Sequence, residues 1–154
     1  MELEKEIKTR FENDYHKVIV NTIYTYGWVT NLLKKRLSKH HITMQQFNIL
    51  RILRGQHPNP ATINILKERM LDKMSDASRI VERLVQKGLV TRCINQKDRR
   101  AVDIIISDKG LDLLKQLDPV ITPIDVLKGN LSEAEAKQLN FLLDKLRGVN
   151  ELKS

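Results

Sequence analysis

Residues 75–110 combine three features that few folds accommodate together: a basic helical segment, a glycine that stops it, and two strand-like segments. Apolar residues at steps of three and four predict a helix over about residues 75–87, which Gly88 ends as its C′ residue. Its expected apolar face holds Met74, Ala77, Val81 and Leu84. Strands are expected at residues 89–94 and 101–106, joined by a short charged turn, and the second strand should point Val102, Ile104 and Ile106 inward. The order predicts a helix followed by a half-buried hairpin with a charged tip.

Positive charge is concentrated in the same part of the chain. Residues 73–100 hold eight Lys or Arg against three acids, a net charge of +5, whereas all 154 residues together carry +8. A basic helix beside a basic hairpin has the charge and the shape expected of a unit that enters the groove of a duplex. The segment therefore predicts a winged helix that binds DNA.

Helices are predicted ahead of this unit. Apolar residues recur at helical spacing over about residues 4–37, which predicts one long amphipathic helix, bent near Gly27. A capping box of Thr43 and Gln46 opens a second helix, and Asn59 followed by a proline opens a short third one. Three short helices closed by a hairpin are the winged form of the helix-turn-helix.

Two further helices are predicted after the hairpin. Ser107 is the expected cap of the first, which Pro119 and Pro123 break or kink, and a capping box of Ser132 and Glu135 opens the last. The apolar faces of the flanking helices need a cover, and a second copy of the chain is the simplest one. The predicted fold is mainly α with a small two- or three-stranded β wing, a winged helix-turn-helix with flanking dimerisation helices.

Several classes of protein are excluded by what the sequence lacks. Its apolar runs fall far short of the roughly 20 residues that a membrane span needs, and its charged amino terminus is unlike a signal peptide, so a cytoplasmic protein is expected. A single cysteine excludes a disulfide framework. The four histidines lack the spacing of metal ligands, so no metal site is expected. The sequence contains no recognisable phosphate-binding loop or nucleophile motif, so neither an enzyme nor a cofactor is expected.

Five short segments carry a resemblance to a known family. They are residues 66–70 (Leu-Lys-Glu-Arg-Met), 78–84, 88–90, 98–100 (Asp-Arg-Arg) and 106–110 (Ile-Ser-Asp-Lys-Gly). With the order of elements over nearly the whole chain, they resemble the MarR (multiple antibiotic resistance regulator) family of bacterial and archaeal transcription factors. The Asp-Arg-Arg triplet is similar to the wing signature of that family.

The resemblance implies one MarR-type unit that forms a homodimer, with about residues 42–108 as the DNA-binding lobe and residues 1–40 and 109–154 as dimerisation helices. Each lobe would place one recognition helix in a major groove and one wing over a minor groove of a pseudo-palindromic operator. Many members are repressors that a small aromatic or phenolic compound releases. The chain departs from the family pattern just before the recognition helix, so either Asp72 or Ser75 is the expected cap.

Nine residues are expected to form the DNA-binding site: Ser75, Asp76, Ser78, Arg79 and Arg83 from the helix, and Lys97, Asp98, Arg99 and Arg100 from the wing turn. Arg79 can donate to guanine O6 and N7 or to a phosphate. Arg100 is assigned by the resemblance to a narrow minor groove, with Asp98 orienting it. Asp76 is better suited to stabilising the start of the helix.

Two alternative functions stay open beside this one, and the place of an effector site stays open within it. A winged-helix adaptor would use the wing for protein contacts, although the basic helix argues against it. A redox-responsive regulator would use Cys93, whose apolar neighbours instead predict a buried thiol. An effector cavity would be lined by aromatic residues, although the same residues could simply belong to the hydrophobic core. They are Tyr15, Tyr24, Tyr26, Trp28 and Phe47.

Overall fold

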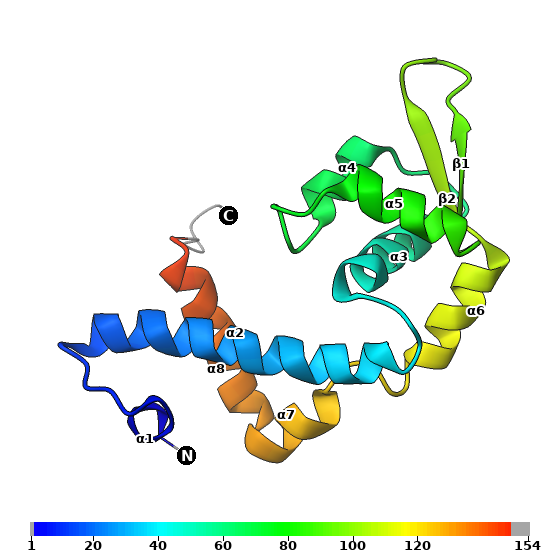
Figure 1. The fold of residues 1–154 in the computed structure, drawn as a ribbon. Coiled ribbons are helices and arrows are strands. Elements are labelled where there is room, and N and C mark those ends of the chain that lie inside the picture. Colours follow the sequence, from blue (N-terminus) through cyan, green and yellow to red (C-terminus); the bar gives the residue numbers. More distant parts are fainter. Residues whose placement is uncertain (1, 149–154) are drawn as a thin grey trace. The chain divides into compact units, whose positions relative to one another are not determined.

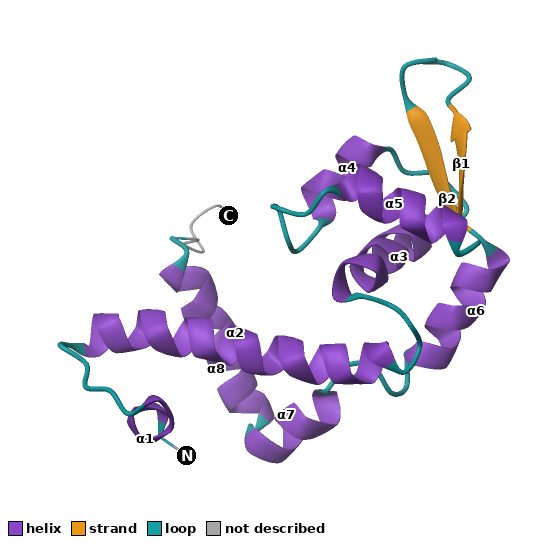
Figure 2. Cartoon of the chain, in the orientation of Figure 1, coloured by secondary structure: helices purple, strands orange, loops and turns teal. Residues whose placement is uncertain are grey.

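The computed structural model describes residues 2–148, which form two compact units, one up to Ile121 and one from Thr122 onward. The chain is mainly helical with one small antiparallel hairpin (Figures 1 and 2). The first unit contains α1 (Leu3–Ile7), α2 (Asp14–Ser38), α3 (Met44–Gln56), α4 (Ile63–Arg69), α5 (Ala77–Gln86), β1 (Val90–Ile94), β2 (Val102–Ile106) and α6 (Asp108–Leu117). The second contains α7 (Ile124–Asn130) and α8 (Glu133–Leu146).

The prediction of one unbroken amino-terminal helix is wrong, because the chain forms α1 and α2 with a loop between them. Lys8 ends α1 with a left-handed backbone at φ 51°. Asn13 then caps α2, its side chain accepting a hydrogen bond from the backbone N–H of His16 at 3.0 Å. α2 continues through Gly27 to Ser38. The local cap at Asn13 thus determines where the long helix begins.

The capping box that opens α3 is confirmed, because Thr43 accepts from the backbone N–H of Gln46 while the Gln46 side chain accepts from the backbone N–H of Thr43. The predicted start of α4 at Asn59 is wrong. Ala61 instead exchanges two backbone hydrogen bonds of 2.9 Å with Ile104 in β2, which holds this segment extended, and Thr62 caps α4. The wing is therefore a two-stranded sheet with one isolated bridge beside it.

α5 begins two residues later than predicted. Its cap is Asp76, which accepts from the backbone N–H of Arg79 at 3.1 Å, so neither Asp72 nor Ser75 fills that position. Met74, expected on the apolar face, lies in the turn before the helix and is 94% exposed. The predicted stop is confirmed, since Gly88 adopts φ +70°, which a residue without a Cβ reaches easily.

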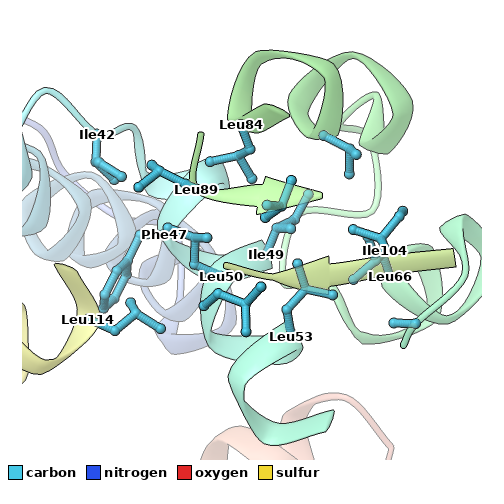
Figure 3. Close-up of a cluster of buried hydrophobic side chains, with 14 of the residues drawn as sticks. Ile42, Phe47, Ile49, Leu50, Leu53, Leu66, Leu84, Leu89, Ile104 and Leu114 are labelled. Carbon is cyan, nitrogen blue, oxygen red and sulfur yellow. The ribbon is translucent and has the colours of Figure 1, made fainter. Parts of the chain in front are cut away.

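The hydrophobic core of the lobe is built around α3 (Figure 3). Ile49 and Leu50 are fully buried, and side chains from α4, α5, β2 and α6 close over them. The contributing residues from those elements include Leu66, Leu84, Ile104 and Leu114. The alternation predicted for β2 is confirmed at Ile104 and Ile106, whereas Val102 is 36% exposed at the outer end of the strand. A single shared core thus orients α5 and the hairpin.

The carboxyl end of α5 is joined closely to the start of α6. Ser107 caps α6 as predicted, accepting from the backbone N–H of Gly110 at 3.1 Å, and its hydroxyl donates to the carbonyl of Gly88 at 2.7 Å. A Cβ on Gly110 would lie 2.3 Å from the carbonyl oxygen of Leu89, so only glycine allows this approach. Lys109 Nζ donates to the carbonyl of Lys87 at 3.0 Å.

The second unit contains one helix more than predicted. α7 follows Pro123 as a short helix, and Ser132 with Glu135 then forms the capping box that was expected for α8. The carboxylate of Glu135 accepts from the backbone N–H and the hydroxyl of Ser132, which lowers its pKa. Among residues 2–148, no helix is long and apolar enough to cross a membrane.

Candidate nucleic-acid interface

The turn between α4 and α5 is fixed by its own side chains. Asp72 accepts from the backbone N–H of Met74 at 3.0 Å and from the hydroxyl of Ser75 at 2.7 Å. These hydrogen bonds, the one from Ser75 first, lower the pKa of the Asp72 carboxyl because they stabilise its ionised form. Asn48 of α3 accepts from the backbone N–H of Leu71 at 3.0 Å. The segment that leads into α5 is therefore anchored to the lobe.

α5 presents a polar face opposite its buried one. Ala77, Val81 and Leu84 are buried, whereas Arg79 and Arg83 are exposed. The two arginines follow each other at a step of four, which places them on one side of the helix. This side is cationic and free to meet a polyanion.

An open groove of about 360 Å³ lies between the amino-terminal ends of α3 and α5. Four of the predicted site residues line it: Ser75, Asp76, Arg79 and Arg83. Thr43, the cap of α3, and Gln45 and Gln46 in its first turn contribute to the other wall, and these residues were not predicted as site residues. Their only signal in the sequence is their place at a capped helix start, which does not indicate a binding surface.

The tip of the wing is a turn organised by Asn95 and Asp98. The Asn95 side-chain oxygen accepts from the backbone N–H groups of Lys97 and Asp98 at 2.8 and 2.9 Å, and its amide donates to Asp103 at 3.0 Å. Asp98 in turn accepts from the backbone N–H of Arg100 at 3.0 Å. Side chains of the turn itself thus hold the backbone conformation of the tip.

The predicted site residues thus fall into two groups. Ser75, Asp76, Arg79 and Arg83 share the groove, Ser78 is exposed on α5 outside the groove lining, and the four wing residues lie at the hairpin tip (Figure 1). Three of the side chains already serve the protein itself, since Ser75 bonds Asp72, Asp76 caps α5 and Asp98 accepts from the backbone N–H of Arg100. The freely exposed cations are therefore the groups best placed to meet a ligand.

Cys93 is exposed in β1, so the expectation of a buried thiol is wrong. Neighbouring residues of a strand point to opposite faces, which directs Arg92 away from the thiol. The residue paired with Cys93 across the hairpin is the acidic Asp103. Neither of these two neighbours brings a cation to the thiol.

The aromatic residues do not gather in one cavity. Phe47 is buried in the lobe core, whereas Tyr15, Tyr24, Tyr26 and Trp28 are 40–85% exposed along α2. Of these, Tyr24 and Trp28 line a concavity beside α1. Within residues 2–148, no group of three or more His, Cys, Asp or Glu side chains could hold a metal ion.

The comparison with protein-family models decides the identity of the lobe. The model of the MarR family matches residues 42–102, from the turn before α3 into β2. By this match the lobe is similar to the MarR-family transcription factors.

Other comparisons extend the similarity beyond the lobe. The chain is 25% identical over 135 residues to the HTH-type transcriptional regulator MhqR of Bacillus subtilis, covering 87% of this chain and 91% of MhqR. A cysteine-to-serine variant of MarR from E. coli, solved in complex with operator DNA, is 26% identical with a TM-score of 0.72, covering 95% of this chain and 99% of that one.

A third similar structure is Bordetella bronchiseptica BpsR, solved to explain the regulation of its DNA binding by 6-hydroxynicotinic acid. It is 20% identical with a TM-score of 0.70, and the match covers 85% of this chain and 98% of BpsR. At that identity the likeness concerns the fold. The chain therefore shares its architecture with these MarR-type structures over most of their length.

Proposed function

We propose that this chain is a MarR-family regulator: a homodimeric repressor that binds double-stranded DNA through α5 and the wing and is released by a small aromatic compound. The observation that carries the proposal is the exposed cationic surface of Arg79, Arg83 and the wing tip on a winged helix. The operator complex of the E. coli relative supports this use of the fold. We further propose that the protein acts in the cytoplasm, where the DNA lies, and that it binds DNA without catalysing a reaction.

The roles of the side chains follow from their chemistry. Arg79 and Arg83 project from α5 toward a major groove, where a guanidinium donates in parallel to guanine O6 and N7 or holds a phosphate. Arg100 enters the minor groove as a mobile cation that reads groove width, and Lys97 and Arg99 contact phosphates. Ser78 donates to the backbone of the duplex.

A dimer is supported by uncovered apolar surface on α2. Tyr15, Ile19, Ile23 and Tyr26 recur at steps of four and three and are 60–85% exposed, so one stripe of the helix lacks a cover within the described chain. α8 carries a second stripe at Leu139, Leu142 and Leu146, 43–55% exposed. Burying such stripes against a second copy is the arrangement proposed here.

A small-molecule effector is proposed from the relatives alone. DNA binding of BpsR is regulated by 6-hydroxynicotinic acid, which is an aromatic acid. We assign no residues of this chain to an effector site.

The test is a fluorescence titration of the full chain with duplex DNA from upstream of its own gene. Specific binding with a Kd of about 10 nM or tighter is expected, and log Kd should change with log salt by about 0.9 for each phosphate neutralised. Two half-sites about 34 Å apart are expected from the twofold symmetry. If no duplex binds specifically and with salt dependence, a winged-helix adaptor becomes the better interpretation.

A further inference from the structure

The turn before α5 exposes two large apolar side chains that the lobe does not bury. Met74 is 94% exposed and Leu71 is 86% exposed, the two highest values among the large hydrophobic residues of the described chain. Isolated exposed apolar residues are common on protein surfaces. These two are unusual because the turn that carries them is anchored at several points.

Met74 is presented by an anchored backbone. Its own N–H donates to Asp72 Oδ1 at 3.0 Å, and the hydroxyl of the next residue, Ser75, donates to Asp72 Oδ2 at 2.7 Å. On the other side of the turn, Lys73 Nζ donates to the carbonyl of Lys67 at 3.2 Å, which joins the turn to the end of α4. The side chain of Met74 therefore projects from a fixed position and loses little backbone freedom on binding.

The position of Met74 relative to α5 indicates what it meets. It lies two residues before the cap Asp76, at the amino-terminal end of the helix. In helix-turn-helix proteins this end of the recognition helix contacts base edges in the major groove. The arginines of the same helix face a polyanion, so the surroundings of Met74 fit DNA better than an apolar protein surface.

The major groove contains one kind of apolar group that the unbranched thioether side chain of Met74 could contact. Its edges carry hydrogen-bond donors and acceptors, except for the C5-methyl group of thymine. Met74 has no polar group that could read the other edges, and its flexible chain adapts to a methyl group at the groove floor. The partner is therefore identified by chemistry as a thymine base.

We propose that Met74 is a specificity-determining residue of this regulator, which selects a thymine in each half-site by contact with its C5-methyl group. The inference rests on the proposed DNA binding and deepens it by naming one base. Arg79 and Arg83 then supply polar or phosphate contacts, and Met74 supplies an apolar one.

The test replaces thymine by deoxyuridine, which removes only the C5-methyl group. Duplexes are first selected by the full wild-type chain from a randomised pool of about 30 base pairs, enough for two half-sites one helical turn apart. Each thymine of the selected site is then replaced in turn. For the wild-type protein, one symmetric pair of replacements is expected to weaken binding about 15-fold, or about fourfold for each half-site.

Protein variants test which side chain causes this loss of affinity, called the deoxyuridine penalty below. Met74→Ala should bind the thymine duplex as weakly as wild type binds the deoxyuridine duplex, and should not distinguish the two. Leu71→Ala, an equal loss of apolar surface in the same turn, should keep the full penalty. Lys97→Ala, at a proposed phosphate contact, should also keep it. Circular dichroism should show all three variants folded, since each side chain is exposed.

The outcomes separate this inference from the proposed function. If wild type selects a specific duplex but no deoxyuridine replacement weakens its binding, Met74 does not contact a thymine methyl group. The proposed DNA binding would be unaffected by that result. A penalty that survives Met74→Ala, or that Leu71→Ala abolishes, also overturns the assignment. A wild-type chain that selects no duplex at all overturns the proposed function itself.

Discussion

At the tip of the wing, Arg100 is held by its backbone and not by its side chain. Asp98 Oδ1 accepts from the Arg100 backbone N–H at 3.0 Å, whereas the Arg100 Nε lies 3.8 Å from the same oxygen. The Arg100 side chain is 97% exposed. The hydrogen bond from Asp98 is thus made to the main chain, while the guanidinium keeps only a long, solvent-exposed ion pair with the same carboxylate.

Replacing Arg100 tests the wing. Arg100→Ala is expected to weaken binding to every DNA site by about 1.5 kcal/mol per protomer, because a charged hydrogen-bond donor is lost from the interface. The melting temperature should not change, since the side chain makes no packing contact with the core. Fluorescence anisotropy at fixed salt measures the affinity.

Arg10→Ala provides the matched control, because Arg10 is an exposed arginine in the loop between α1 and α2. It removes the same charge outside the proposed interface and should leave the affinity nearly unchanged. Equal affinities of Arg100→Ala and wild type would remove the wing from the mechanism.

Asp118 makes the stability of the lobe depend on pH. Its carboxylate accepts hydrogen bonds from Arg54 Nη1 at 2.7 Å and Nη2 at 3.0 Å, which joins the end of α6 to α3. The hydrogen bond from Arg54 lowers the pKa of Asp118. Between the folded and unfolded pKa values the unfolded chain binds more protons, so the stabilisation is complete above about pH 4 and is lost as the pH falls further.

Asp118→Asn should therefore lower the free energy of unfolding at neutral pH by about 0.5 kcal/mol, a small value because the pair is partly solvated. The difference from wild type should shrink as the pH drops below about 4. Urea unfolding at several pH values measures it. Asp112→Asn, at an exposed carboxylate on the same helix, is the control, and an equal pH dependence of both variants would contradict the role of Arg54.

At the scale of elements, α6 approaches the base of the wing so closely that Gly110 has no room for a Cβ. Gly110→Ala would place a methyl group 2.3 Å from the carbonyl oxygen of Leu89 and 2.7 Å from Ile106 Cγ1. The helix must then shift away, and the variant is expected to lose about 1–3 kcal/mol of stability. Chemical denaturation measures the change.

Gly55→Ala is the control for the substitution itself. Gly55 lies in α3, and a Cβ there meets nothing within 4 Å. Because alanine is the better helix former, this variant should gain up to about 1 kcal/mol. Equal effects of the two substitutions would show that the contact at Leu89 is not tight.

Local signals determined which elements the sequence revealed. The capping boxes at Thr43 and Ser132 and the stop at Gly88 depend on neighbouring residues only, and all three were predicted correctly. The break before Asn13 was missed because apolar residues keep helical spacing across it. The extended segment at Ala61 was missed because its partner, Ile104, is far away in the sequence.

The candidate site divides in the same way. Charge alone marked Arg79, Arg83 and the wing tip as a cationic surface. The anchoring role of Asp72 was not predictable, because it depends on where the backbone turns. Met74 was placed in the core because its spacing to Ala77 and Val81 continues the helical pattern, which only the observed cap interrupts.

At the scale of the whole molecule, the uncovered stripe of α2 continues the face that packs on the lobe. Leu37, near the end of α2, is 1% exposed, and at 100° per residue it shares a side of the helix with Ile19 and Ile23, which are 60% and 66% exposed. One face is thus buried at one end and bare at the other. The division of the chain into a lobe at about residues 42–108 and dimerisation helices stays a prediction.

A charge in the bare part of this face should dissociate the proposed dimer. Ile23→Lys is expected to convert dimer to monomer at micromolar concentration in sedimentation experiments, because burying an unpaired ammonium group at the interface is unfavourable. DNA affinity should fall with it, since one half-site alone is then bound.

Asn31→Lys adds the same charge on another face of α2 and should leave the dimer intact. A dimer that survives Ile23→Lys would place the interface elsewhere on the chain. Far-ultraviolet circular dichroism checks that both variants keep their helices.

The junction between Gly88 and Gly110 ties the position of α5 to that of α6. Three hydrogen bonds and a glycine too confined for a methyl group join the two helices, so a displacement of α6 is expected to move the arginines of α5 as well. In the proposed dimer, the spacing of the two α5 helices must match the helical repeat of DNA. A change in the tilt of α6 is therefore expected to weaken binding to an operator with two half-sites.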